Sequence, residues 1–226
     1  MESKTTETSQ NPVIDSEVLF TYLIQGKRKE ASEFIQECVQ KGYPILHIYE
    51  EIIKPALYHV GEYWENNFIT VAEEHTATSI VEFLMNGLFE QIISKERVQK
   101  KIILACTEKE THRVGLKMVA DIFEMKGWDT YFPGATIPVG DLIKYIEQVR
   151  PNILALSTSV YFHLPSLEKM LKNIKKAFPD LPVIVGGQAF RHGGKEVLQS
   201  FDNTFYIADL KSLMTFIDFF ESEHIE

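Results

Sequence analysis

Between about residue 13 and residue 93, hydrophobic residues recur at intervals of three and four, which is the spacing of one face of an α-helix. One such stripe consists of Ala31, Phe34, Ile35, Cys38 and Val39. Gly42 follows this stripe and suits a helix end in the left-handed conformation. Pro55 lies inside a later periodic stretch, where its missing N–H is expected to kink or divide the helix. The sequence Thr70-Val-Ala-Glu73 matches a capping box and predicts the start of a further helix, so we expect four or five helices in this half.

After residue 95 the pattern changes to short apolar or β-branched runs, separated by amphipathic stretches. Five strands are predicted, at residues 101–106, 128–132, 153–157, 183–185 and 204–207. Alternation of strands and helices is typical of a parallel sheet with crossover helices on both faces. We therefore expect an α/β protein: a polar disordered tail (1–12), a helical bundle (13–95) and a doubly wound, Rossmann- or flavodoxin-like domain with five strands (96–226).

Charge and cysteine content narrow the possible functions. The chain of 226 residues has a net charge of −9, which opposes direct binding of nucleic acid. Its two cysteines are far apart in the sequence, which argues against a disulfide framework and fits a reducing compartment. Neither a membrane span nor a signal peptide is visible, so we expect a soluble cytoplasmic protein without a membrane partner.

The loop after the first predicted strand carries candidate metal-binding chemistry. It lacks the glycine-rich turn that cradles a pyrophosphate, but it contains Glu110, His112 and Gly115. A neutral imidazole is a good metal ligand, and a nearby carboxylate can orient it. One histidine cannot complete a zinc site, so this loop suits a metal already held by a macrocycle, unless His112 is simply a solvated loop residue.

Two further loops at the carboxyl ends of strands are candidates for ligand contacts. Ser157 and Ser159 end the third strand, and Gly186 and Gly187 end the fourth. Glycines at a strand end allow a ligand to approach the backbone closely. Each feature alone also fits an ordinary strand end or turn.

Together these elements resemble the cobalamin-binding domains, whose signature is Asp-x-His-x-x-Gly, then Ser-x-Leu, then Gly-Gly. The resemblance covers about residues 100–220 and implies a base-off, His-on cobalamin. It makes His112 the lower cobalt ligand, with Glu110 as its partner. The remaining positions that it assigns to cofactor binding are Gly115, Ser157, Ser159, Gly186 and Gly187. Two positions depart from the signature, because Glu110 replaces Asp and Ser159 replaces Leu.

The helical half contains a second resemblance. Trp64, followed after nine residues by Glu74 and His75, is similar to the motif of light-sensing adenosylcobalamin repressors of the CarH type. In that family these residues pack around the adenosyl group, and the bundle caps the upper face of the corrin. Glu74 lies at the edge of the apolar helix face, whereas His75 points further round. The alternative is that Trp64 is a core residue, Glu74 a first-turn carboxylate and His75 a surface residue.

Two features depart from the CarH type. Glu65 follows Trp64 directly, where those photoreceptors have a histidine that can capture cobalt after light breaks the cobalt–carbon bond. Carboxylate matches cobalt(III) less well than imidazole, unless His59 or His75 reaches the metal. No helix-turn-helix pattern precedes the bundle, so we expect signalling through a homo-oligomer or a partner regulator protein rather than direct DNA binding.

The sequence thus favours a cobalamin-binding sensor, a photoreceptor rather than an enzyme, using adenosylcobalamin. One alternative is a corrinoid protein that carries methyl groups between methyltransferases, and another is an interaction module without cofactor. His163 and His192, in loops after the third and fourth strands, are interpreted as solvated residues; the alternatives are that His163 approaches the corrin edge and that His192 borders the nucleotide tail. Tyr161 and Phe162 are equally compatible with packing and with corrin contact.

Overall fold

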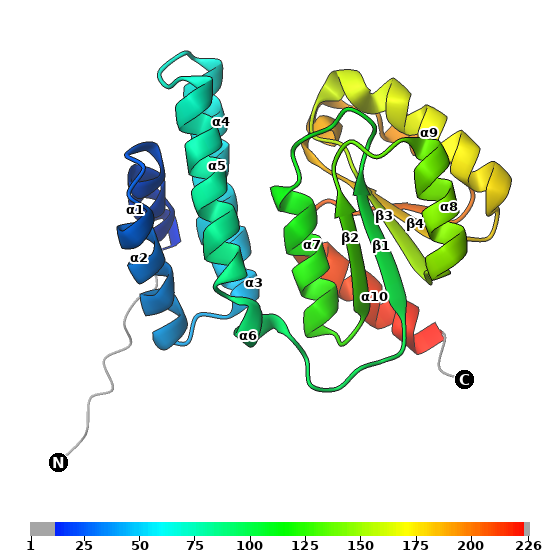
Figure 1. The fold of residues 1–226 in the computed structure, drawn as a ribbon, viewed down its shortest axis with the longest axis horizontal. Helices are drawn as coiled ribbons and strands as arrows, with labels where there is room; N and C mark the ends of the chain where they lie inside the picture. Colours follow the sequence, from blue (N-terminus) through cyan, green and yellow to red (C-terminus); the bar gives the residue numbers. More distant parts are fainter. Residues whose placement is uncertain (1–11, 224–226) are drawn as a thin grey trace. The chain divides into compact units, whose positions relative to one another are not determined.

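The computed structural model describes residues 12–223, and the chain forms two compact units, Met1–Gly87 and Leu88–Glu226. The expected disordered tail lies outside the described residues, apart from Pro12. The boundary between the units lies eight residues before the one expected at residue 95. Each unit is considered by itself below (Figure 1).

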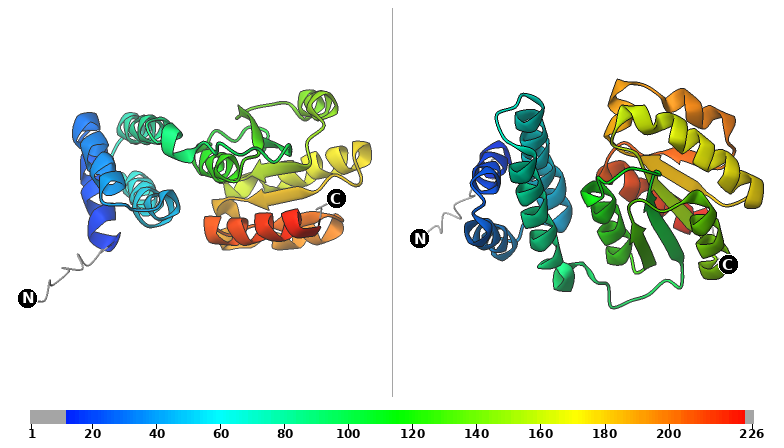
Figure 2. Two further views of the ribbon diagram at one scale, coloured as in Figure 1. Left: turned by 90° about the horizontal axis from the view of Figure 1, so that it is seen from below. Right: turned by 45° about the horizontal axis from the view of Figure 1, so that its top comes forward.

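The first unit is helical, as expected. Its long helices are α1 (Pro12–Ile24), α2 (Arg28–Gln40), α4 (Lys54–Glu65) and α5 (Val71–Asn86). Their apolar faces meet in a core that includes Leu19, Ile35, Val60 and Val81. Figure 2 shows these helices from two further directions.

Two sequence predictions of helix ends are confirmed. Gly42 follows the end of α2 with φ +81°, and the N–H of Tyr43 donates to the carbonyl of Cys38, closing the helix end. At the start of α5, the hydroxyl of Thr70 accepts from the N–H of Glu73, and the Glu73 carboxylate accepts from the N–H of Thr70. This is the predicted capping box.

Of the two outcomes expected for Pro55, a kink or a division of the helix, the division does not occur. Short α3 (Ile45–His47), the π-helical turns of η1 (Ile48–Ile53) and α4 follow one another without a gap. Pro55 lies in the first turn of α4. Proline cannot donate to a carbonyl four residues back and its ring crowds that carbonyl, so the wider π ladder ahead of it accommodates the residue without ending the helix.

The second unit is the predicted doubly wound α/β domain. Its five strands are all parallel: β1 (Lys101–Cys106), β2 (Asp129–Gly134), β3 (Ile153–Ser157), β4 (Val183–Gly186) and β5 (Thr204–Tyr206). β1 and β3 coincide with their predicted ranges, β4 and β5 differ by one residue at the carboxyl end, and β2 differs by one residue at its start and two at its end.

Helices cover both faces of this sheet (Figure 1). On one face α7 (Val114–Met125) contacts α10 (Leu210–Glu223), and on the other α8 (Val139–Val149) contacts α9 (Leu164–Ala177). Short η2 (Tyr161–His163), η3 (Gln188–His192) and η4 (Lys195–Ser200) lie in the loops after β3 and β4. No helix within residues 12–223 is long and apolar enough to cross a membrane.

The boundary at Gly87 has a structural reason. Short α6 (Phe89–Ile92) packs on α7, and the segment after it is tied to the same domain. The Arg97 guanidinium bonds Glu124 and Asp129 at 2.8 Å each and also the carbonyl of Trp128. Residues 88–100 therefore belong to the α/β unit.

Strand order locates the point where a ligand is expected. The order is β2-β1-β3-β4-β5, so the chain leaves β1 towards one edge of the sheet and leaves β3 towards the other. In open parallel sheets, ligands bind beyond the carboxyl ends of the strands at such a switch point. Here that point lies between the loops after β1 and β3.

Candidate functional site

Glu110 is the centre of the switch point. Its side chain is fully buried, and it accepts hydrogen bonds from both loops. One oxygen, Oε1, accepts from the N–H groups of Thr111 (3.1 Å) and His112 (3.2 Å) and contacts His112 Nδ1 at 2.5 Å. The other, Oε2, accepts from the N–H groups of Ser159 and Val160, both at 2.9 Å. One carboxylate thus fixes two loops that are about fifty residues apart in the sequence.

These hydrogen bonds determine the charge state of Glu110. Burial alone would raise its pKa. Hydrogen bonds from the His112 side chain and from the backbone of Val160 and His112 act in the opposite direction, and the pKa is held well below its usual range. Glu110 is therefore a buried anion with its hydrogen-bonding capacity used.

His112 is held by this anion while its ring reaches solvent. The side chain is 60 % exposed, and Nδ1 is the nitrogen that faces Glu110. A proton on Nδ1, donated to the carboxylate, leaves the lone pair on Nε2. The carboxylate thus fixes the direction of the ring, an arrangement that suits an imidazole for metal binding.

His163 also contacts Glu110, so its interpretation as a solvated loop residue is wrong. Its Nδ1 lies 3.1 Å from Glu110 Oε2, and its side chain is 24 % exposed. The sequence spacing held no indication of this contact, which exists because β1 and β3 are neighbours. The side chain of His192 is outside the described residues.

The serines and glycines that the sequence singled out at the ends of strands three and four lie next to these loops. The structure shows which contacts each of them makes within the protein. Ser157 is buried and pairs with Gly186 in the sheet, and Ser159 contributes its backbone N–H to Glu110. Gly187 has φ +116°, and a Cβ there would lie 2.1 Å from the carbonyl oxygen of Thr158. Internal packing alone therefore requires this glycine.

Gly115 differs from Gly187. It is the second residue of α7, it is exposed, and a Cβ built on it meets no atom within 4 Å. Its φ is not in the left-handed region. Nothing among the described residues requires glycine at this position.

In the helical unit, Trp64 lies near the end of α4 and is 45 % exposed. The alternative that Trp64 is a core residue is therefore wrong. Glu74 and His75 lie in the first turns of α5, with His75 Nδ1 at 2.5 Å from Glu74 Oε2. Their side chains are 22 % and 75 % exposed, respectively, so Glu74 turns inward and His75 outward, as the helical pattern predicts.

His59, which the sequence left open as a second cobalt ligand, is engaged within the bundle. Its ring stacks on Phe20 with 3.9 Å between centroids, and its Nδ1 lies 3.2 Å from a Glu17 oxygen. These contacts give His59 a packing role in the helical unit.

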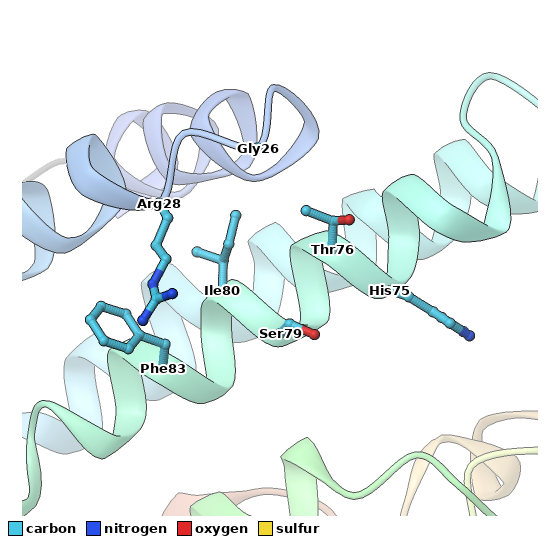
Figure 3. A pocket seen from close by; sticks show the side chains of 7 residues that line it. All are labelled: Gly26, Arg28, His75, Thr76, Ser79, Ile80 and Phe83. Carbon is cyan, nitrogen blue, oxygen red and sulfur yellow. The ribbon is translucent and has the colours of Figure 1, made fainter.

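A hollow of about 470 Å³ opens on the helical unit. Its lining comes from the α1–α2 turn and from one face of α5: Gly26, Arg28, His75, Thr76, Ser79, Ile80 and Phe83. Figure 3 shows the Arg28 guanidinium over the Phe83 ring, 3.7 Å from its centroid, and the His75 ring directed away from them. Trp64 and Glu74 do not line this hollow.

The donor set decides which kind of metal centre fits. Among the described residues no group of three or more His, Cys, Asp or Glu side chains could hold a metal ion. Cys106 is buried below the loop, and burial raises the pKa of its thiol to about 12, so it is a poor thiolate ligand. A single oriented imidazole fits a metal whose other ligands come from a macrocycle.

Fold and site together define a class: a doubly wound α/β domain with an exposed imidazole oriented by a buried carboxylate at its switch point, preceded by a helical unit. B12 binding domains match the chain twice, over residues 16–88 and residues 100–208. The chain therefore belongs to the B12-binding family, and cobalamin is the ligand that this membership supports.

Two curated proteins of Myxococcus xanthus are similar to this chain. The HTH-type transcriptional repressor CarH is 33 % identical over 155 residues, which is 68 % of this chain and 51 % of CarH. The HTH-type transcriptional repressor CarA is 27 % identical over 129 residues, 57 % of this chain and 44 % of CarA. The matched region thus spans about half the length of each relative.

Among solved structures, the monomethylamine corrinoid protein of Methanosarcina barkeri has the same fold. The TM-score is 0.78 with 13 % identity, and the match covers 92 % of this chain and 99 % of that one. At this identity the likeness concerns the fold alone.

Proposed function

We propose that the protein is a sensor that binds adenosylcobalamin and responds to light. The observation that carries the proposal is the exposed imidazole of His112, held by the buried Glu110 carboxylate at the β1/β3 switch point. His112 Nε2 would be the lower cobalt ligand. When bound, the cofactor supplies a cobalt–carbon bond that light can break, so the reactive bond belongs to the cofactor and the protein needs no catalytic residue of its own.

In the α/β unit, the side chains and backbone of the protein would hold the cofactor and orient its cobalt ligand. Glu110 keeps the His112 ring in one tautomer and one direction. Gly115 allows close approach beside the His112 loop, since no side chain stands there. Ser157, Ser159, Gly186 and Gly187 border the end of the sheet, where the nucleotide tail of a base-off cobalamin would bind.

In the helical unit, Trp64, Glu74 and His75 would select the adenosyl group. The exposed indole offers a flat apolar surface, and the Glu74 carboxylate can accept hydrogen bonds from ribose hydroxyls. Glu65 replaces the histidine of the CarH type, so the state after illumination would lack that imidazole and differ from that of those photoreceptors.

The output of the sensor would be a change in affinity for a second copy of the chain or for a partner regulator. A cofactor can shift such an equilibrium only by binding the two states differently. Cys38 and Cys106 are free and buried, which supports the reducing cytoplasm as its location. Direct binding of nucleic acid is not part of the proposal, given the net charge of −9.

The second candidate is a methyl-carrying corrinoid protein. Glu65 favours it, because the residue that captures cobalt in CarH-type photoreceptors is replaced. A carrier needs an open upper face and has no use for adenosyl selection.

One experiment separates the two candidates. The purified protein is mixed in darkness with adenosylcobalamin or methylcobalamin, and absorbance and size-exclusion profiles are recorded before and after green light. The sensor is expected to retain the adenosyl form and to change its assembly state on illumination. Retention of the methyl form alone, with no response to light, would reject the sensor.

Matched variants test each side of the cofactor. His112→Ala is expected to abolish the base-off, His-on spectrum, whereas His75→Ala keeps it. Trp64→Ala is expected to weaken adenosylcobalamin binding more than hydroxocobalamin binding. Phe68→Ala, which removes another exposed aromatic ring after the same helix, is the control for that effect.

A further inference from the structure

The turn after β3 carries the most exposed of the large hydrophobic side chains whose exposure the structure describes. Phe162 is 87 % exposed, and Tyr161 beside it is 46 % exposed. Their rings meet edge to face with 6.3 Å between centroids. Single exposed phenylalanines are common on protein surfaces, so exposure alone assigns no role to this pair.

The position of the turn is what distinguishes it. The backbone N–H groups of Ser159 and Val160 donate to Glu110 before the pair, and His163 Nδ1 contacts Glu110 after it. The N–H of His163 also donates to the carbonyl of Val160 at 2.9 Å, which closes the turn. Phe162 is therefore mounted on a backbone that is fixed on both sides.

The anchor of this turn is also the anchor of His112. Oxygen Oε1 of Glu110 orients the imidazole, while Oε2 fixes the turn that carries Phe162. A ligand bound to His112 would therefore lie near the turn that carries Phe162, because the same carboxylate fixes both. The two exposed rings place an apolar surface beside the polar pair of Glu110 and His112.

We propose that Phe162, supported by Tyr161, forms a second wall of the cobalamin site and packs against the methyl-bearing edge of the corrin ring. This inference rests on the proposed function. Corrin is a broad macrocycle with an apolar periphery between its amide arms, and covering Phe162 with it removes the ring from water. An exposed phenylalanine contributes little to the stability of the free protein, so its contribution appears only when the ligand binds.

The test compares three proteins: the unsubstituted chain, Phe162→Ala, and Phe219→Ala as the matched control. Phe219 is 58 % exposed and lies on α10 of the same unit, outside the switch-point loops. Hydroxocobalamin is titrated in darkness, and the dissociation constant and the spectrum at saturation are measured by absorbance.

Phe162→Ala is expected to raise the dissociation constant about 10- to 100-fold, the effect of leaving one phenylalanine-sized surface uncovered. Its spectrum at saturation should remain His-on, because the Glu110–His112 pair is intact. The dissociation constant of the control Phe219→Ala should stay within about twofold of that of the unsubstituted chain. Without cofactor, both variants should have the melting temperature of the unsubstituted chain. Rescue by Phe162→Leu to an intermediate affinity would support an apolar contact.

An equal dissociation constant for Phe162→Ala and the unsubstituted chain would overturn the inference while leaving His112 ligation standing. A changed assembly state of the cofactor-free variant on size exclusion would also overturn it, since a second copy would then cover the ring. If the unsubstituted chain does not bind hydroxocobalamin, the proposed function itself fails.

Discussion

Each of the two units contains a glutamate whose carboxylate contacts a histidine ring. The two pairs have the same contact distance but differ in burial and in their other hydrogen bonds. In both, a carboxylate oxygen lies 2.5 Å from Nδ1 of the imidazole. Glu110 is fully buried and accepts hydrogen bonds from the backbone of two loops. Glu74 is 22 % exposed and, besides its contact with His75, accepts a hydrogen bond from the Thr78 hydroxyl. The first pair is fixed by its surroundings, and the second is held mainly by its own side chains.

The difference follows from the secondary structure that carries each pair. On α5 the backbone N–H groups beyond the first turn donate to carbonyls four residues back, so they cannot converge on Glu74. In the loops after β1 and β3 the N–H groups are not used by a helix or sheet, and those of Thr111, His112, Ser159 and Val160 reach Glu110. A loop at a switch point can therefore orient a ligand more rigidly than a helix surface can.

The largest expected effect comes from removing the charge of the buried carboxylate. Glu110→Gln should lower the free energy of unfolding of the α/β unit by about 3 to 5 kcal/mol, because an amide donor then faces N–H donors in a buried place. Glu74→Gln should change the helical unit by less than about 1 kcal/mol. Urea unfolding followed by tryptophan fluorescence separates the units, since Trp128 is buried in one and Trp64 is exposed in the other. Equal effects of the two substitutions would break the comparison.

Lowering the pH should reduce the stability of the α/β unit through protonation of Glu110. The folded pKa of Glu110 lies below the usual range, so the unfolded chain takes up the proton first as the pH falls. The contribution of Glu110 is complete above about pH 5 and declines progressively as the pH falls below about 4 towards the lowered folded pKa, with a slope of at most about 1.4 kcal/mol per pH unit. The free energy of unfolding of the α/β unit, measured from pH 6 to pH 3, should fall more steeply in the unsubstituted chain than in Glu110→Gln. Parallel curves would contradict the assignment.

A smaller effect is expected at the start of α5, which carries the exposed pair. Thr70→Ala removes the hydroxyl that accepts from the N–H of Glu73, while the backbone N–H at position 70 can still donate to the Glu73 carboxylate; the loss should lower the stability of the helical unit by about 1 kcal/mol. Thr76→Ala, on the same helix, removes a hydroxyl that bonds only the Ala72 carbonyl and should be close to neutral. Thermal unfolding monitored by circular dichroism measures both, and an equal loss in the two variants would show that the cap contributes nothing.

The smallest effect on stability is expected at Gly115. Gly115→Ala should leave the cofactor-free protein unchanged or stabilise it by up to about 1 kcal/mol, because the new Cβ meets no atom and alanine favours a helix. Gly140, also the second residue of a helix with open space for a Cβ, is the matched control. Hydroxocobalamin titration should show weaker binding for Gly115→Ala alone. Equal binding by both variants would mean that Gly115 has no ligand role.

Much of the fold could be predicted from periodicity. The strand positions, the capping box at Thr70 and the helix end at Gly42 depend on residues within four or five positions of each other, so a local pattern describes them fully. Pro55 shows the limit of such patterns. Its missing donor was visible in the sequence, but whether the helix breaks or widens its ladder depends on how the neighbouring turns pack.

A glutamate, a histidine and a glycine after an apolar strand could be recognised from the printed sequence, and they sufficed to propose a metal ligand in that loop. The packed fold brings His163 and the amides of Ser159 and Val160 to Glu110, and it shows that the carbonyl of Thr158 leaves no room for a side chain at Gly187. The physical reason is that hydrogen bonds between distant loops depend on which strands are neighbours. A local pattern carries no information on that order, and the packed sheet alone decides it.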